Sequence, residues 1–114
     1  TVLAEKLETV ISRNITNTRM RDFYDIYILQ KLYDEQIKKE VLWSALVATA
    51  RKRGTVEQIE SGDIRGIFDE IESSPVMDKL WKAYQKNYSY SADITWHMAM
   101  ESVRYLYETG ASAN

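Results

Sequence analysis

The sequence predicts an all-α protein, a small bundle of about six helices. Apolar residues recur every three or four positions through most of the 114 residues, which is the spacing of one face of a helix. The chain has one proline and four glycines, and it contains no Asn-Gly or Asp-Gly pair that would indicate a β-hairpin. Its hydrophobic content of 45% and charged content of 28% are typical of one globular domain with its own core.

The N-terminal half predicts three helices. An apolar stripe at helical spacing indicates a helix over residues 2–13, and the Asn/Thr-rich stretch NITNT follows it as a connector. Thr18 is a suitable N-cap for a second helix over residues 19–33. This helix is apolar on most sides, so we expect it to be the central one. Asp34 can cap a third helix over residues 35–53, which ends in three cations and a glycine, as the helix dipole and a left-handed C′ residue favour.

The C-terminal half predicts shorter helices. Residues 55–58, TVEQ, match a capping box that opens a short helix, and an apolar stripe over residues 63–72 indicates another. The sequence Ser74-Pro75 supplies an N-cap and a first helical residue for a helix that runs to about residue 87. The last helix is expected over residues 94–108.

Residues 1–109 are expected to form a single helical domain, followed by a disordered tail over residues 110–114. The chain begins on Thr1 with a helical pattern already in register, so we interpret it as a fragment of a longer chain. No apolar run approaches the roughly 20 residues of a membrane span, and no signal peptide is visible. The absence of cysteine excludes disulfides and cysteine-based zinc sites and fits a reducing compartment, the cytoplasm.

The net charge is only −2, but it is unevenly distributed. Residues 13–53 carry nine Lys/Arg against five Asp/Glu, whereas residues 54–114 carry five against ten. The first half is therefore suited to an anion, and the second half to water or a basic partner. The net charge itself does not indicate nucleic-acid binding.

A cluster of charges opens the second predicted helix, in the sequence RMRDFYD. Asp22 and Asp25 lie three positions apart and point from one face, where Arg21 can pair with Asp25. One interpretation is structural, because the helix dipole stabilises acidic residues in a first turn. The other is catalytic: Lys6 and Arg13 lie along the same surface, and cations beside a carboxylate suit a triphosphate–Mg²⁺ site. Two carboxylates alone make an incomplete Mg²⁺ site, so no metal site is expected within these residues.

Two further features are interpreted structurally. His97 has no histidine or cysteine at ligand spacing, so we expect a partly buried or capping imidazole and not a metal ligand. The sequence ARKR at residues 50–53 is interpreted as a solvated helix end that complements the dipole, in preference to a phosphate-contacting patch. No Walker A, nucleophile-elbow, HExxH or EF-hand pattern occurs.

The segment EKLETVISR, joined by the Asn/Thr-rich connector to RDFYDI, resembles the last two motifs of the AbiEii-type nucleotidyltransferase toxins. The resemblance continues through MDKLWKAYQKNY into the final predicted helix. It implies a two-part enzyme in which an N-terminal nucleotidyltransferase core carries a GSxxxD motif and metal-binding acidic residues. This chain would be the helical C-terminal region that closes the cleft.

The resemblance also implies roles for the charged cluster. Lys6 would contact the nucleotide triphosphate, and Asp22, or as second choice Asp25, would be the catalytic aspartate. Arg13 and Arg21 are further candidates for nucleotide binding because of their place on the same surface. Such toxins use Mg²⁺ and an NTP, transfer the nucleotide in characterised cases to tRNA, and serve toxin–antitoxin or phage-abortive systems with an antitoxin encoded alongside. The chain has no GSxxxD motif and thus no metal platform, so alone we expect it to be inactive and to bind neither ligand tightly.

The alternative belongs to a different class, a non-catalytic helical module that binds a protein or RNA through the basic first half. RNA binding that weakens steeply with salt would favour it. The identity of the nucleotide and the acceptor stays open. So does homodimerisation of the fragment through a surface that the missing core would otherwise cover.

Overall fold

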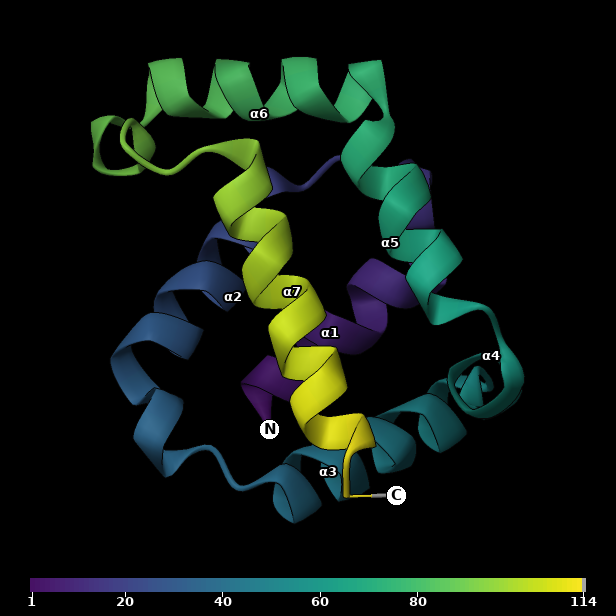
Figure 1. Cartoon of the computed structure of the whole chain (residues 1–114). Coiled ribbons are helices and arrows are strands. Elements are labelled where there is room, and N and C mark those ends of the chain that lie inside the picture. Colours follow the sequence, from purple (N-terminus) through teal and green to yellow (C-terminus); the bar gives the residue numbers. More distant parts are fainter. Residues whose placement is uncertain (114) are drawn as a thin grey trace.

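The computed structural model describes residues 1–113 and is helical throughout that range, without a strand (Figure 1). The all-α prediction is confirmed, with seven α-helices in the described residues. In chain order they are α1 (Val2–Arg13), α2 (Met20–Tyr33), α3 (Lys39–Arg53), α4 (Val56–Ser61), α5 (Ile64–Ser73), α6 (Pro75–Asn87) and α7 (Trp96–Ala111). Three short 3₁₀ helices connect them: η1 (Asn14–Thr16), η2 (Asp34–Gln36) and η3 (Ser89–Ser91). Within the described range, every helix is too short or too polar to cross a membrane.

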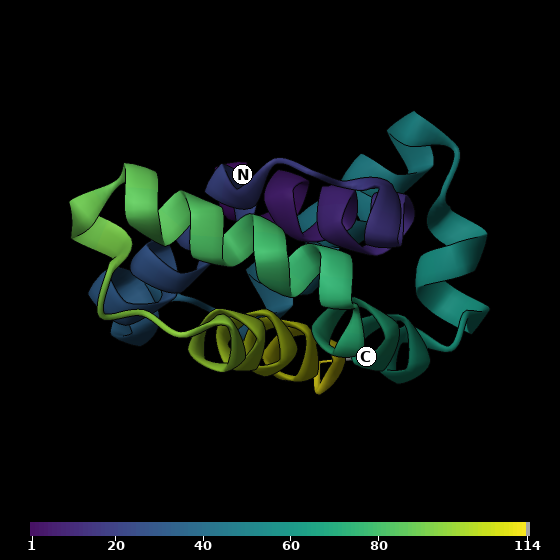
Figure 2. The same ribbon diagram turned by 90° about the horizontal axis from the view of Figure 1, so that it is seen from above.

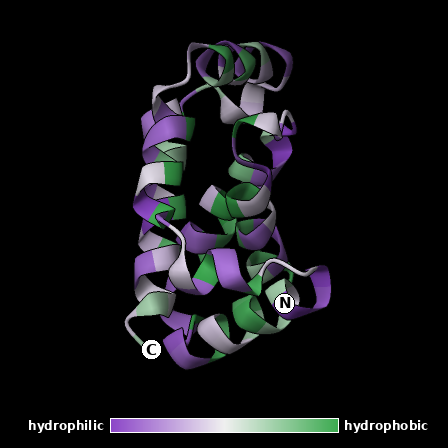
Figure 3. Cartoon of the chain, turned by 90° about the vertical axis from the view of Figure 1, so that its right-hand side faces the viewer, coloured by the Kyte–Doolittle hydropathy of each residue, from purple (hydrophilic) through white to green (hydrophobic). Residues whose placement is uncertain are grey.

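The helices form a flattened bundle measuring 37 × 28 × 20 Å. α1 packs against α2 and α3, and α7 packs against α2, α3 and α5. Seen from above, α1 and α7 lie on opposite sides of the bundle, while α6 runs across one end (Figures 1 and 2). The hydrophobic parts of the ribbons face the space between these layers, and hydrophilic parts face outward (Figure 3).

The core receives a buried apolar side chain from every α-helix. Its aromatic part joins three helices: the rings of Phe23 and Trp96 meet edge to face at 5.0 Å, and Trp81 lies 5.7 Å from Trp96. Both indole N–H groups are satisfied, because Trp81 donates to the Ile94 carbonyl and Trp96 to the Glu72 carbonyl. Buried tryptophans need such partners. The first bond ties α6 to the segment before α7, and the second ties α7 to the end of α5.

Several predicted boundaries are confirmed. α1 begins and ends where the apolar stripe predicts. The Ser74 hydroxyl accepts a hydrogen bond from the Met77 N–H, with Pro75 as the first helical residue of α6. Gly54 ends α3 with φ of 77°, the left-handed conformation that glycine adopts without strain.

Two predicted helix starts were wrong. For the second helix the predicted N-cap residue was wrong, and for the third helix the predicted first residue was wrong. Thr18 makes no cap; the Asn17 side chain instead accepts from the Arg19 N–H at 3.1 Å. Residues 34–36 form η2 and Lys38 is extended, so α3 begins at Lys39, four residues later than predicted. Tertiary packing here overrides a continuous helical pattern.

The prediction that the second helix is central was also wrong. Leu32 and Tyr33, at the end of α2, are more than half exposed, whereas the apolar stripe of α1 is fully buried at Leu7, Val10 and Ile11. The apolar residues of α2 are therefore not all buried, because those at its end are partly exposed. α1 is therefore the more central of the two helices.

The predicted tail begins too early. α7 continues through Ala111, and Gly110 is buried against α3. A Cβ atom on Gly110 would lie 3.5 Å from the Leu42 side chain and 3.7 Å from Trp43, so this glycine is part of the α3–α7 contact. Asn114, the last residue of the predicted tail, lies outside the described residues.

Candidate functional site

Lys6 on α1 joins the two aspartates of α2. Its Nζ lies 3.2 Å from Asp22 Oδ1 and 3.1 Å from Asp25 Oδ2. The contact exists because η1 and the residues after it reverse the chain, so that the start of α2 packs beside α1. One ammonium group thus serves two carboxylates from adjacent turns of a helix.

Asp22 is the buried member of this group, with 2% of its surface exposed. Its Oδ1 also forms an ion pair with Arg19 Nη2 at 3.5 Å, and its Oδ2 accepts a hydrogen bond from Asn17 Nδ2 at 3.3 Å. Asn17 is itself buried and is oriented by its bond to the Arg19 backbone. A buried carboxylate is costly unless it is paired and hydrogen-bonded, and here both oxygens have partners.

A surface pocket of about 450 Å³ opens beside this pair. Its walls come from one face of α1, from the start of α2, from the end of α3 and from Thr55, just before α4. The ionisable side chains in the lining are four cations and three carboxylates: Lys6, Arg13, Arg19, Arg53, Glu5, Glu8 and Asp22. A pocket of this size accommodates a small ligand, and its cations favour an anionic one.

The structure brings some of the predicted site residues together and sets others apart. Lys6, Arg13 and Asp22 line the pocket. Arg21 and Asp25 do not: Arg21 is exposed, and its Nε donates to Asp25 Oδ1 at 2.9 Å. The Asp25 carboxylate raises the pKa of the Arg21 guanidinium. Arg21 thus holds Asp25 in place for Lys6.

Sequence reasoning missed Glu8, Arg53 and Thr55. The Glu8 carboxylate is 1% exposed; it accepts from Arg53 Nη1 through Oε1 and from Thr55 Oγ1 at 2.7 Å through Oε2. Residues 51–53 are exposed in the last turn of α3, as predicted, but Arg53 also pairs with the buried Glu8, which the prediction did not include. The predicted capping box at residue 55 was wrong, because the Thr55 hydroxyl makes no cap bond. No spacing rule links partners that lie 45 and 47 positions apart.

Comparison with known proteins identifies the family to which this chain belongs. Residues 1–108 match the family model described as Nucleotidyl transferase AbiEii toxin, Type IV TA system. The chain belongs to the AbiEii family. No curated protein and no solved structure matches it.

The match confirms the resemblance noted in the sequence and spans the whole charged cluster from Lys6 to Asp25. The AbiEii family is described as nucleotidyltransferase toxins of type IV toxin–antitoxin systems. The pocket of this AbiEii-family chain has cations that suit the phosphates of a nucleotide. A metal is different: in residues 1–113 no group of three or more His, Asp or Glu side chains is arranged to hold one. The oxygens of Asp22 and Asp25 are occupied by cationic and amide donors, so these residues do not fit Mg²⁺ by themselves.

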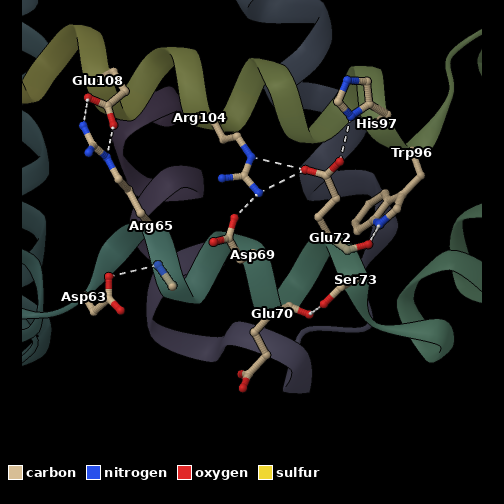
Figure 4. Close-up of polar contacts among 11 residues, drawn as sticks. Asp63, Arg65, Asp69, Glu70, Glu72, Ser73, Trp96, His97, Arg104 and Glu108 are labelled. Carbon is tan, nitrogen blue, oxygen red and sulfur yellow. Dashed lines mark hydrogen bonds and ion pairs between the residues drawn. The ribbon is translucent and has the colours of Figure 1, made fainter.

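A second charged cluster joins α5 to α7 on another face (Figure 4). His97 was expected to be partly buried or a cap, but it is exposed, with Nδ1 2.7 Å from Glu72 and Nε2 2.8 Å from Glu101. These two carboxylates raise the pKa of His97 above 6.5, the hydrogen bond to Glu72 most of all. Arg104 completes the cluster by contacting Glu72 at 3.1 Å and Asp69 at 2.9 Å. These pairs link α5 to α7, and none of their residues lines the pocket beside Asp22.

Proposed function

We propose that this chain is the nucleotide-binding helical region of an AbiEii-type toxin that transfers a nucleotide from an NTP to an acceptor such as tRNA. The observation that carries the proposal is the contact of Lys6 with Asp22 at the edge of a pocket lined by four cations. The family description supports the reaction class.

The triphosphate binds in the pocket in this proposal. Lys6, Arg13 and Arg19 supply charge-assisted hydrogen bonds to phosphate oxygens. Lys6 is held by two carboxylates before the nucleotide arrives, so little side-chain entropy is lost on binding. Arg21 does not contact the triphosphate in this proposal; it orients Asp25, which in turn holds Lys6.

Asp22 is the proposed catalytic carboxylate and Asp25 the second candidate. Asp22 lines the pocket, whereas Asp25 lies beside it. In this proposal Asp22 stays paired with Lys6 beside the bound phosphates, where its carboxylate can orient a reacting group.

The proposed toxin contains more than this chain. The metal-binding acidic residues come from an N-terminal nucleotidyltransferase core, which is the principal proposed partner and provides the Mg²⁺ chemistry. The 114-residue chain alone is inactive in this proposal. A cytoplasmic location and an antitoxin encoded alongside belong to the same proposal.

The test uses the toxin with its core. Lys6→Ala and Asp22→Asn should each abolish nucleotide transfer while the helical content, measured by circular dichroism, stays unchanged. Lys52→Ala is the control, because it removes an exposed lysine that is not in the pocket lining. Full transfer activity in both site variants would overturn the proposal. Salt-sensitive RNA binding by the chain, with no effect of nucleotide, would favour the interaction module instead.

A further inference from the structure

Glu8 is a buried carboxylate whose partners come from far along the chain. Arg53 is the last residue of α3, and Thr55 stands just before α4. Gly54, in the left-handed conformation between them, reverses the chain so that both side chains reach Glu8. The end of α3 is thereby fixed on α1 through this one carboxylate.

The Arg53 guanidinium is held through one nitrogen. Nη1 donates to Glu8 Oε1 and to Thr9 Oγ1 at 3.0 Å, and it also lies 3.5 Å from the Glu5 carbonyl oxygen. Within residues 1–113, Arg53 makes its hydrogen bonds through Nη1, which leaves the Nε–H and Nη2–H donors for a ligand. The side chain is 43% exposed and lines the pocket. The two remaining donors have the fork geometry that binds phosphate oxygens.

Arg53 and Lys6 border different parts of the same pocket. Lys6 and Glu8 are two positions apart on α1, so they point to different sides of the helix. Lys6 therefore meets Asp22 of α2, while Glu8 meets Arg53 of α3. Thr9 and Arg13, three and seven positions after Lys6, line the pocket between them.

We propose that Arg53 is a second phosphate-binding residue of this pocket and that Glu8 is its positioning residue. The ligand class is a polyphosphate chain, which spans from the Lys6 side of the pocket to Arg53. That this polyphosphate is the triphosphate of a nucleotide rests on the proposed function. That the pocket binds a polyphosphate anion does not rest on it.

Two alternatives for the Glu8–Arg53 pair predict different properties. A pair that only stabilises the fold would have no reason to face a pocket of cations, and apolar residues of similar volume often stabilise as well. A general excess of positive charge at the end of α3 would make Arg51, Lys52 and Arg53 equivalent. Only a fixed donor predicts that, of these three cations, Arg53 alone contributes to anion binding.

The experiment titrates inorganic triphosphate into the 114-residue chain at low salt, up to millimolar concentration, and follows binding by calorimetry. Arg53→Ala should weaken binding about tenfold, the size of one charge-assisted hydrogen bond. Arg51→Ala is the matched control: it removes the same charge from the same last turn, and Arg51 does not line this pocket. It should change affinity by less than about twofold.

Two more variants separate positioning from folding. Arg53→Lys keeps the charge and loses the fork, so it should bind with intermediate affinity. Glu8→Gln keeps the shape, removes one negative charge from the pocket and frees Arg53 to move. It should weaken triphosphate binding in spite of the added positive charge, because Arg53 is no longer held in place.

The outcomes separate the inference from the proposed function. Equal losses in Arg53→Ala and Arg51→Ala, or no binding by the unaltered chain, would overturn the inference. Weakening by Lys6→Ala but not by Arg53→Ala would overturn it and leave the proposed function standing. The reverse pattern would support Arg53 as a polyphosphate ligand and contradict the role of Lys6.

Discussion

The Lys6 ammonium group lies 3.2 Å from the Asp22 carboxylate, although 16 positions separate the two residues in the chain. Around this contact, Asn17 and Arg19 complete the environment of Asp22, and Asp25 completes that of Lys6. The first helical hairpin of the protein is thus closed by a polar network and not by apolar packing alone. The same network borders the pocket, so stability and ligand binding depend on shared residues.

The two aspartates should differ in their effect on stability. Asp22→Ala leaves the buried Asn17 amide and part of the Lys6 charge unpaired, and we expect a loss of roughly 3 kcal/mol in the free energy of unfolding. Asp25→Ala should cost about 1 kcal/mol or less, because Asp25 is partly exposed and Lys6 keeps Asp22. Urea denaturation of both variants checks this. Equal losses would show that the burial of Asp22 has no energetic consequence.

Two glycines should respond to alanine with opposite signs. Gly54 has φ of 77°, which an L-residue adopts only with strain, so Gly54→Ala should destabilise the protein by about 1 kcal/mol. Gly110 is helical, and an added Cβ would make ordinary contacts with Leu42 and Trp43. Gly110→Ala should therefore stabilise by roughly 0.5 kcal/mol, since alanine has the higher helix propensity. Thermal melts of the pair provide the measurement, and each variant is the control for the other.

His97 makes the stability of the α5–α7 contact depend on pH. Its pKa is raised in the folded protein by Glu72 and Glu101, so the stabilisation is fully present below the pKa of the unfolded state, near 6.5. It is lost as the pH rises through the higher folded pKa. The difference in unfolding free energy between the protein and His97→Gln should thus be larger at about pH 5.5 than at about pH 8.5. Because His97 is exposed, added salt should reduce the difference. A pH-independent difference would contradict the pairing with both carboxylates.

Local signals predicted those parts of the fold whose causes are local. The apolar stripe of α1, the Ser74 cap of α6 and the left-handed Gly54 depend on neighbours within a few positions, and all three are as predicted. The pairing of Arg21 with Asp25 was predicted on the same basis, from their i, i+4 spacing. For the site, the sequence placed Lys6 and Asp22 on one surface, and their contact agrees with that.

The features that were not predicted depend on distant partners. α3 begins at Lys39 because η2 and an extended residue interrupt a pattern that is locally compatible with a helix. Glu8 looks like an ordinary solvated glutamate in α1, and only the fold places Arg53 beside it. Asn17 reads as a connector residue, although it is buried against Asp22. Polar residues that are buried with long-range partners leave no periodic trace in the sequence.

Thr55 gives the sharpest distinction between a local and a long-range role. Its sequence context predicts a capping box, but its hydroxyl donates to the buried Glu8 carboxylate at 2.7 Å. Thr55→Val keeps the shape and removes the donor, so it should cost roughly 2 kcal/mol, typical of a hydrogen bond to a charged group. Thr55→Ser keeps the hydroxyl and should cost less.

A double-mutant cycle with Glu8→Gln decides between the two roles of Thr55. If the hydroxyl acts through Glu8, Thr55→Val should cost about 1 kcal/mol less in the Glu8→Gln background than in the unaltered chain, because the bond to a charge is already gone. If Thr55 acts as a cap of α4, its cost should be the same in both backgrounds. Urea denaturation of the four proteins gives the coupling energy. A value near zero would mean that the end of α3 is fixed to α1 by Arg53 without help from Thr55.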